Sequence, residues 1–131
     1  MDKILIIGFG KLGSHLYYSL KSTGKYRVTA AKKRNKKSIL SGLVKNADVI
    51  FICVQDSKIT KTAESIVKLR VPLKNKIIFH TSGALTSDAI KVLKQHSTYT
   101  GSFHPVQSFA KRTTRLTDSF NEIYIATEGD K

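Results

Sequence analysis

The chain has 131 residues and a formal net charge of +14, with 40% hydrophobic and 24% charged residues. This length suits one domain with a single hydrophobic core, and the composition is typical of a folded protein rather than a disordered one. No apolar run approaches the roughly 20 residues that would span a bilayer. The N-terminal residues also lack the basic and apolar pattern of a secretory signal. We therefore expect a cytoplasmic protein with no membrane partner.

The excess of lysine and arginine could indicate a polyanionic partner, because clustered cations neutralise phosphate groups. Most of these cations are spread along the chain, without the interleaved aromatic residues of a base-stacking surface. We therefore do not expect nucleic acid as a main partner. One dense basic block stands out, Lys32-Lys33-Arg34 followed by Lys36-Lys37.

Short apolar runs that predict buried strands recur along the chain. They are Ile4–Ile7, Arg27–Ala31, Val49–Val54, Lys76–Phe79, Thr100–Phe103 and Ile123–Ala126. Segments with helical periodicity lie between them: Leu12, Leu16 and Leu20 share one helix face, and a similar stripe follows the third strand at Ile59, Ala63, Ile66 and Val67. Thr86 and Ser87 are candidate caps for a later helix. This alternation predicts a single doubly wound α/β domain with a mostly parallel sheet over residues 1–131.

The first predicted strand runs directly into Gly8-Phe9-Gly10-Lys11-Leu12-Gly13. A G-x-G-x-x-G match alone is weak, but this one has the required strand before it and amphipathic helix after it. Gly8 permits a tight turn, Gly10 leaves room for a pyrophosphate, and Gly13 lets the helix pack closely on the strand. The phosphates would bind the free N–H groups at the helix N-terminus. We predict a Rossmann dinucleotide-binding domain in which these six residues contact the cofactor.

The end of the second strand bears on the choice of cofactor. NAD-binding domains usually place Asp or Glu there to bind the ribose hydroxyls, whereas this chain has Lys32-Lys33-Arg34 and no carboxylate from Lys3 to Val44. Lysine and arginine would pair with the 2′-phosphate of NADP. We therefore favour NADP(H) over NAD; the alternative is that these cations belong only to a basic surface.

The third strand ends at a second part of the predicted site. Val54 and Gln55 should flank the ribose and nicotinamide, because ligands of open α/β sheets lie beyond the carboxyl ends of the strands. Asp56 is interpreted as the N-cap of the following helix, and Cys53 as a small buried core residue. The four histidines and one cysteine have no spacing typical of a metal site.

Two later segments place polar residues at strand ends. His80-Thr81-Ser82-Gly83-Ala84 follows the fourth strand, and the run from Gly101 to Phe109, which contains His104-Pro105, includes the fifth. Together with the glycine loop and Val54-Gln55-Asp56, these segments resemble a family of NADP-dependent oxidoreductases. Its members have an N-terminal Rossmann domain and a helical C-terminal domain, and are relatives of pyrroline-5-carboxylate reductase and 6-phosphogluconate dehydrogenase. The resemblance extends from Ile4 to Asp130.

The resemblance implies roles for particular residues. Ser82 and Gly83 would contact cofactor or substrate, and Ser82 would be one of two catalytic groups. The His-Pro pair is similar to that of prephenate dehydrogenases, which implies that His104 is the acid/base group; imidazoles suit this task because they titrate near neutral pH. The alternative for His104 is a structural hydrogen bond to a loop. His80 is interpreted as a strand-end residue.

The helical C-terminal domain of that family has no counterpart in this sequence. The resemblance therefore implies the cofactor half of an oxidoreductase that transfers hydride to or from a small molecule, and that does not turn over alone. Self-association or a separate C-terminal partner is expected. A stand-alone dinucleotide sensor without catalysis is the alternative, although Lys32-Lys33-Arg34 and the Ser82 and His104 clusters argue against it.

Overall fold

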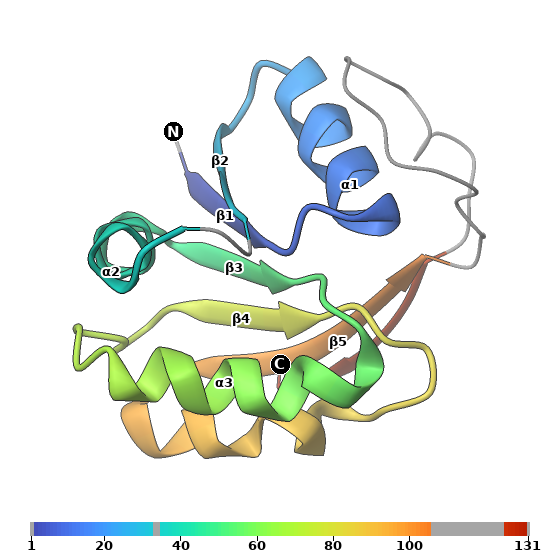
Figure 1. The fold of residues 1–131 in the computed structure, drawn as a ribbon. Coiled ribbons are helices and arrows are strands. Elements are labelled where there is room, and N and C mark those ends of the chain that lie inside the picture. The colour runs from blue at the N-terminus through green and yellow to red at the C-terminus, as the bar shows by residue number, and fades with distance from the viewer. Residues whose placement is uncertain (1, 33–34, 106–124, 131) are drawn as a thin grey trace.

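The computed structural model of the chain describes residues 2–32, 35–105 and 125–130. In chain order its elements are β1 (Lys3–Ile7), α1 (Lys11–Ser22), β2 (Arg27–Ala31), α2 (Lys37–Asn46), β3 (Val49–Ile52), η1 (Asp56–Lys58), α3 (Ile59–Lys68), β4 (Ile77–His80), η2 (Ser87–His96), β5 (Tyr99–Pro105) and β6 (Ile125–Gly129). The elements η1 and η2 are 3-10 helices. Figure 1 shows the ribbon.

The six strands form one sheet in the order β2-β1-β3-β4-β5-β6. Strands β1 to β5 are parallel, and β6 runs antiparallel to β5. The predicted doubly wound, mostly parallel α/β fold is confirmed. The chain leaves β1 to one side toward β2 and then crosses to the other side toward β3. The gap between the carboxyl ends of β1 and β3 is therefore the topological switch point, where this fold class binds its ligands.

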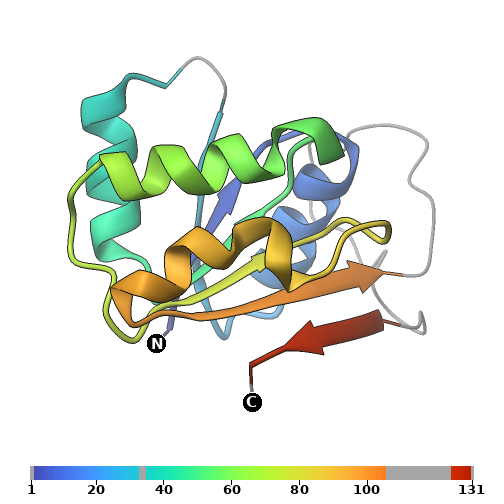
Figure 2. The same cartoon turned by 90° about the horizontal axis from the view of Figure 1, so that it is seen from below.

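Helices cover both faces of the sheet (Figure 1). On one face, α2, α3 and η2 pack against an aliphatic core, in which Ile59, Ala63 and Ile66 of α3 have no exposed surface, as their spacing predicted. Figure 2 shows α3 and η2 lying side by side across this face. On the other face, α1 places Leu16 against Ile6 in a second core cluster. That cluster continues over β3 to β5 as three phenylalanine rings, Phe51, Phe79 and Phe103, with centroids 5.2–5.9 Å apart.

The helix ends show which predicted caps form. Thr86 caps η2, since its side chain accepts a hydrogen bond from the backbone N–H of Asp88. The expected cap at Asp56 is wrong: Gln55 holds the N-cap position of η1, Asp56 is the first residue inside the turn, and no side chain caps it. The cause is that β3 ends at Ile52, two residues before the expected Val54, so the chain turns earlier than its apolar run indicates.

The C-terminus of α2 is held by a lysine from elsewhere in the chain. The ammonium group of Lys76, just before β4, donates to the carbonyls of Lys45 and Ala47. Burial lowers the pKa of Lys76, although Asp48 nearby acts in the opposite direction. A cation at this helix end also opposes the negative end of the helix dipole. Within the described residues, no helix has both the length and the apolar character needed to cross a membrane.

Candidate dinucleotide-binding site

The glycine turn between β1 and α1 is packed so tightly that two of its positions have no room for a Cβ atom. Gly8 has φ of +96°, and its N–H donates to the carbonyl of Ala31 at 3.0 Å. A Cβ on Gly8 would lie 2.6 Å from the carbonyl oxygen of Cys53, and a Cβ on Gly13 would lie 1.9 Å from that of Gly8. Glycine at both positions therefore brings α1 into direct contact with the ends of β1 and β3.

Gly10 differs from these two glycines because it faces open space. No heavy atom lies within 4 Å of a Cβ built there, and its φ of −86° is open to any residue. Gly10 is the N-cap of α1, where no side chain makes a capping hydrogen bond, and the first turn of α1 has no acidic residue. No side chain of the described residues thus caps that turn, and its N–H groups form a site suited to an anion.

A groove of about 520 Å³ opens beside this turn, at the switch point of the sheet. The strand ends line it with Ile7, Gly8, Gly10, Ala31, Lys32, Cys53, Val54 and Gln55, and the helical side lines it with Asn35, Leu40, Lys58, Thr62 and Ser65. Among the described residues that line it, none is a carboxylate and two are lysines. The groove thus combines cations with an uncapped helix N-terminus, which suits an anionic dinucleotide.

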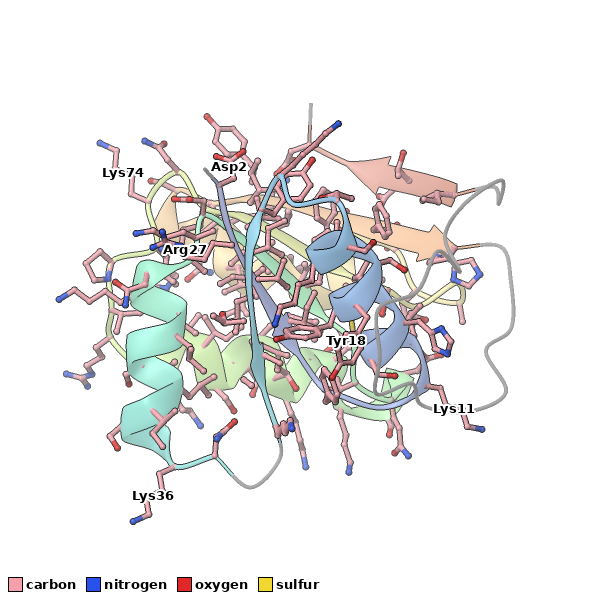
Figure 3. All side chains as sticks on the ribbon, turned by 90° about the horizontal axis from the view of Figure 1, so that it is seen from above. Asp2, Lys11, Tyr18, Arg27, Lys36 and Lys74 are labelled. Atoms are coloured by element: carbon pink, nitrogen blue, oxygen red, sulfur yellow. The ribbon has the colours of Figure 1, made fainter. Side chains whose placement is uncertain are left out.

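Five of the predicted cofactor-binding residues line the groove, together with residues that were not predicted to bind the cofactor. Those that line the groove are Gly8, Gly10, Lys32, Val54 and Gln55, whereas Phe9, Lys11, Leu12 and Gly13 flank it without lining it. In Figure 3, Lys11 points away from the body of the protein at the start of α1. Asn35, Thr62 and Ser65 were not predicted. The signal for two of them was present: Lys58, Thr62 and Ser65 form a polar stripe at helical spacing, beside the apolar stripe of α3.

Lys32 lines the groove, and both its backbone and its side chain contact other residues. Its backbone N–H donates to the Asn35 Oδ1 at 2.6 Å, and its exposed ammonium group lies 4.9 Å from the centre of the Phe9 ring. The predicted 2′-phosphate contacts from Lys33 and Arg34 lie outside the described residues.

The second polar cluster lies farther along the same edge of the sheet, at the ends of β4 and β5. The His104 Nδ1 is 3.3 Å from the carbonyl oxygen of Thr81. A carbonyl only accepts, so Nδ1 carries the proton and Nε2 is the basic atom of the neutral ring. The ring lies against Gly83, where a Cβ would be 2.5 Å from Nε2. His104 thus lies against the turn that contains Ser82 and Gly83, and all three residues are outside the lining of the groove. Positions 106 to 109 of this segment lie outside the described residues.

His80 fixes the turn that carries Ser82 and Gly83. This imidazole has no exposed surface; its Nε2 is 2.7 Å from the carbonyl oxygen of Thr86, and its Nδ1 accepts the backbone N–H of Ser82 at 3.1 Å. Both ring nitrogens are therefore engaged within the protein, which agrees with a structural role for His80. Ser82 is buried, and its Oγ accepts the N–H of Ala84 at 3.1 Å.

Cys53 borders the groove and is only half-buried, less than its apolar surroundings in the sequence predict. Burial of the thiol raises the pKa of Cys53 to about 12, against a smaller lowering by a hydrogen bond with Thr81. The thiol is therefore neutral at physiological pH and is not a nucleophile. In the part of the chain that the structure describes, no group of three or more histidine, cysteine or acidic residues could hold a metal ion.

No family model matches the sequence, and comparison with curated proteins gave no match. Solved structures do match. Prephenate dehydrogenase from Aquifex aeolicus, in complex with hydroxyphenyl propionate and NAD⁺, aligns with a TM-score of 0.75 and 13% identity, over 100% of this chain and 51% of its own. Pyrroline carboxylate reductase from Plasmodium falciparum with NADP bound aligns with a TM-score of 0.72 and 14% identity, over 99% of this chain and 48% of its own.

A third match is arogenate dehydrogenase from Synechocystis, with a TM-score of 0.64 and 18% identity, over 82% of this chain and 42% of its own. The chain spans about half the length of the structures it matches. The chain therefore has the Rossmann fold found in these NAD(P)-dependent dehydrogenases and reductases.

Proposed function

We propose that this chain is the NADP(H)-binding domain of an oxidoreductase that transfers hydride to or from a small molecule. The observation that carries the proposal is the groove at the switch point. There the open Gly10 and the uncapped N-terminus of α1 meet a lining with lysines and no carboxylate. Among the solved structures with this fold, one holds NAD⁺ and another NADP.

Each part of the groove fits one part of the dinucleotide. The N–H groups at the start of α1 would bind the pyrophosphate. Lys32, together with the sequence neighbours Lys33 and Arg34, would pair with the 2′-phosphate that distinguishes NADP from NAD. Val54 and Gln55 would flank the nicotinamide end. The bound nicotinamide supplies the hydride chemistry, and the protein supplies binding and orientation.

The His104 cluster would serve the substrate. Its Nε2 is the basic atom of an imidazole whose other nitrogen is held by the Thr81 carbonyl, so it can take a proton from, or return one to, a hydroxyl or amine. Gly83 gives the ring the space to lie against the turn. Ser82 would contribute its hydroxyl proton, because its oxygen already accepts the N–H of Ala84.

Because the chain spans about half of the solved structures it matches, we propose that turnover needs a further protein part. That part would cover the His104 cluster, and a second copy of this chain or a separate partner could supply it. The chain alone should bind cofactor without catalysis.

Calorimetric titration of the chain with NADPH, and with NADH in parallel, tests the proposal. We expect one NADPH per chain, bound at least about tenfold more tightly than NADH, because one charge-assisted pair with the 2′-phosphate contributes about 1.5–3 kcal/mol. Binding of neither dinucleotide would reject the proposed function, and tighter binding of NADH would reject the assignment of NADP.

A further inference from the structure

Lys32 lies where its charge can distinguish the two cofactors, but an exposed lysine is a poorly directed charge. Its four-carbon chain samples many rotamers in water, and fixing it costs conformational entropy. In this structure the ammonium group lies 4.9 Å from the centre of the Phe9 ring, within the range of a cation–π attraction. Phe9 does not line the groove, whereas Lys32 does.

The Phe9 ring is itself held in place. It packs edge to face against Tyr17 at 5.3 Å and Tyr18 at 6.1 Å between ring centroids, and these two rings pack edge to face on each other at 4.9 Å. Figure 3 shows Tyr18 between α1 and β2. Such packing fixes the direction of the electron-rich ring face. With the Asn35 side chain holding the Lys32 backbone, the lysine is directed at both ends.

We infer that Phe9 is a positioning residue for cofactor selection: its ring holds the ammonium group of Lys32, which lines the groove, ready for the 2′-phosphate of NADP. This inference rests on the proposed function and deepens it. The glycine turn therefore contributes to phosphate binding at Gly10 and, one residue earlier, to the choice between the two dinucleotides.

The test compares cofactor preference in Phe9→Leu and Phe9→Tyr. Loss of the aromatic face in Phe9→Leu should reduce the preference for NADPH over NADH by about threefold to fivefold, whereas Phe9→Tyr should keep it. Adenosine 2′,5′-bisphosphate and AMP, titrated in the same way, isolate the adenosine end of the site and should show the same change in ratio.

Lys21 provides a matched control. Lys21 is also exposed, and its ammonium group lies 5.4 Å from the centre of the Tyr17 ring; both residues belong to α1. Unlike Lys32, it does not line the groove. Lys21→Gln should leave the ratio of the two affinities unchanged. Lys32→Met should reduce the ratio, and adding Phe9→Leu to Lys32→Met should reduce it no further, because both changes act on one interaction.

The outcomes separate the two proposals. A Phe9→Leu variant that loses NADPH and NADH affinity equally, or that keeps the parent ratio, overturns the role of Phe9 and leaves the proposed function intact. A parent chain that binds neither dinucleotide overturns both. Circular dichroism of each variant shows whether the fold is kept, and Phe9→Met replaces Phe9→Leu in the test if Phe9→Leu does not fold.

Discussion

Gly8, Gly13 and Gly83 each face another group of the protein at a distance that admits no Cβ, whereas Gly10 faces open space. The first two bring α1 against the strands, and Gly83 lets the His104 ring lie against its turn. The reason for glycine at position 10 is not internal packing. In the proposed function, a ligand that approaches the backbone there would account for it.

Replacing Gly10 therefore tests the site without disturbing the fold. Gly10→Leu should fold like the parent and bind NADPH at least about tenfold more weakly, because the side chain fills the space of the pyrophosphate and separates it from the α1 N–H groups. Calorimetry measures the affinity. Gly42→Leu is the matched control, since Gly42 also faces open space but lies on α2 away from the groove. Undiminished binding by Gly10→Leu would refute the placement of the phosphates.

At the level of elements, the antiparallel strand β6 and the residue that follows it bind both ends of η2. The Glu128 carboxylate accepts the backbone N–H and the hydroxyl of Ser87, each at 2.9 Å, at the start of that helix. Asp130 forms an ion pair with Lys94 at 2.8 Å, near its end. Glu128 at the start of η2 and Lys94 near its end each have the charge that this end of a helix favours. Two of the nine acidic residues of this basic chain thus lie in one short segment, where they join β6 to the helix across the sheet.

The ion pair makes part of the stability dependent on pH. The hydrogen bond from Lys94, and then that from the Thr100 backbone, lower the pKa of Asp130 below its ordinary value. A carboxyl with a lowered folded pKa stabilises the fold above its unfolded pKa of about 3.9, and this contribution disappears as the pH falls through the folded pKa. Asp130→Asn should therefore be less stable than the parent at pH 7.

The difference in unfolding free energy between parent and Asp130→Asn should shrink as the pH falls below about 4. Urea denaturation at pH 7, 5 and 3 measures it. A difference that stays constant over this range would show that the charge of Asp130 does not stabilise the fold.

At the scale of the whole molecule, the parallel topology places the groove and the His104 cluster on one edge of the sheet. The groove lies at the ends of β1, β2 and β3, and the cluster lies at the ends of the next strands, β4 and β5. The residues that line the groove come from segments between Ile7 and Ser65, so a cofactor that binds here would contact several elements of the first half of the chain. Binding should therefore stabilise the domain as a unit.

This coupling predicts a thermal shift. NADPH at 100 times its dissociation constant should stabilise the folded state by about 2.7 kcal/mol, which raises the melting temperature of a domain of this size by roughly 10 °C. Differential scanning calorimetry with and without NADPH measures the shift, and Gly10→Leu should show little of it. Equal shifts in the two proteins would place the bound NADPH elsewhere.

The sequence by itself determined the features that depend on neighbouring residues. The glycine turn follows from a spacing of six residues, and the buried faces of α1 and α3 follow from helical periodicity. Alternation of apolar strands and helices was enough to predict the doubly wound sheet. The end of β3 was predicted two residues late, because apolar character continues past the last residue that pairs.

Only the tertiary structure decided the features that join distant parts of the chain. Asn35, Thr62 and Ser65 line the groove with Gly8 because three strand ends converge there, and no local pattern of Asn35 indicates this. His80 and His104 look alike in the sequence, yet one has both nitrogens engaged by its own turn and the other keeps Nε2 as its basic atom. Lys32 gains its direction from a ring 23 positions earlier in the chain. Such contacts depend on packing between elements that are far apart in the sequence, and local sequence patterns do not show the distances between them.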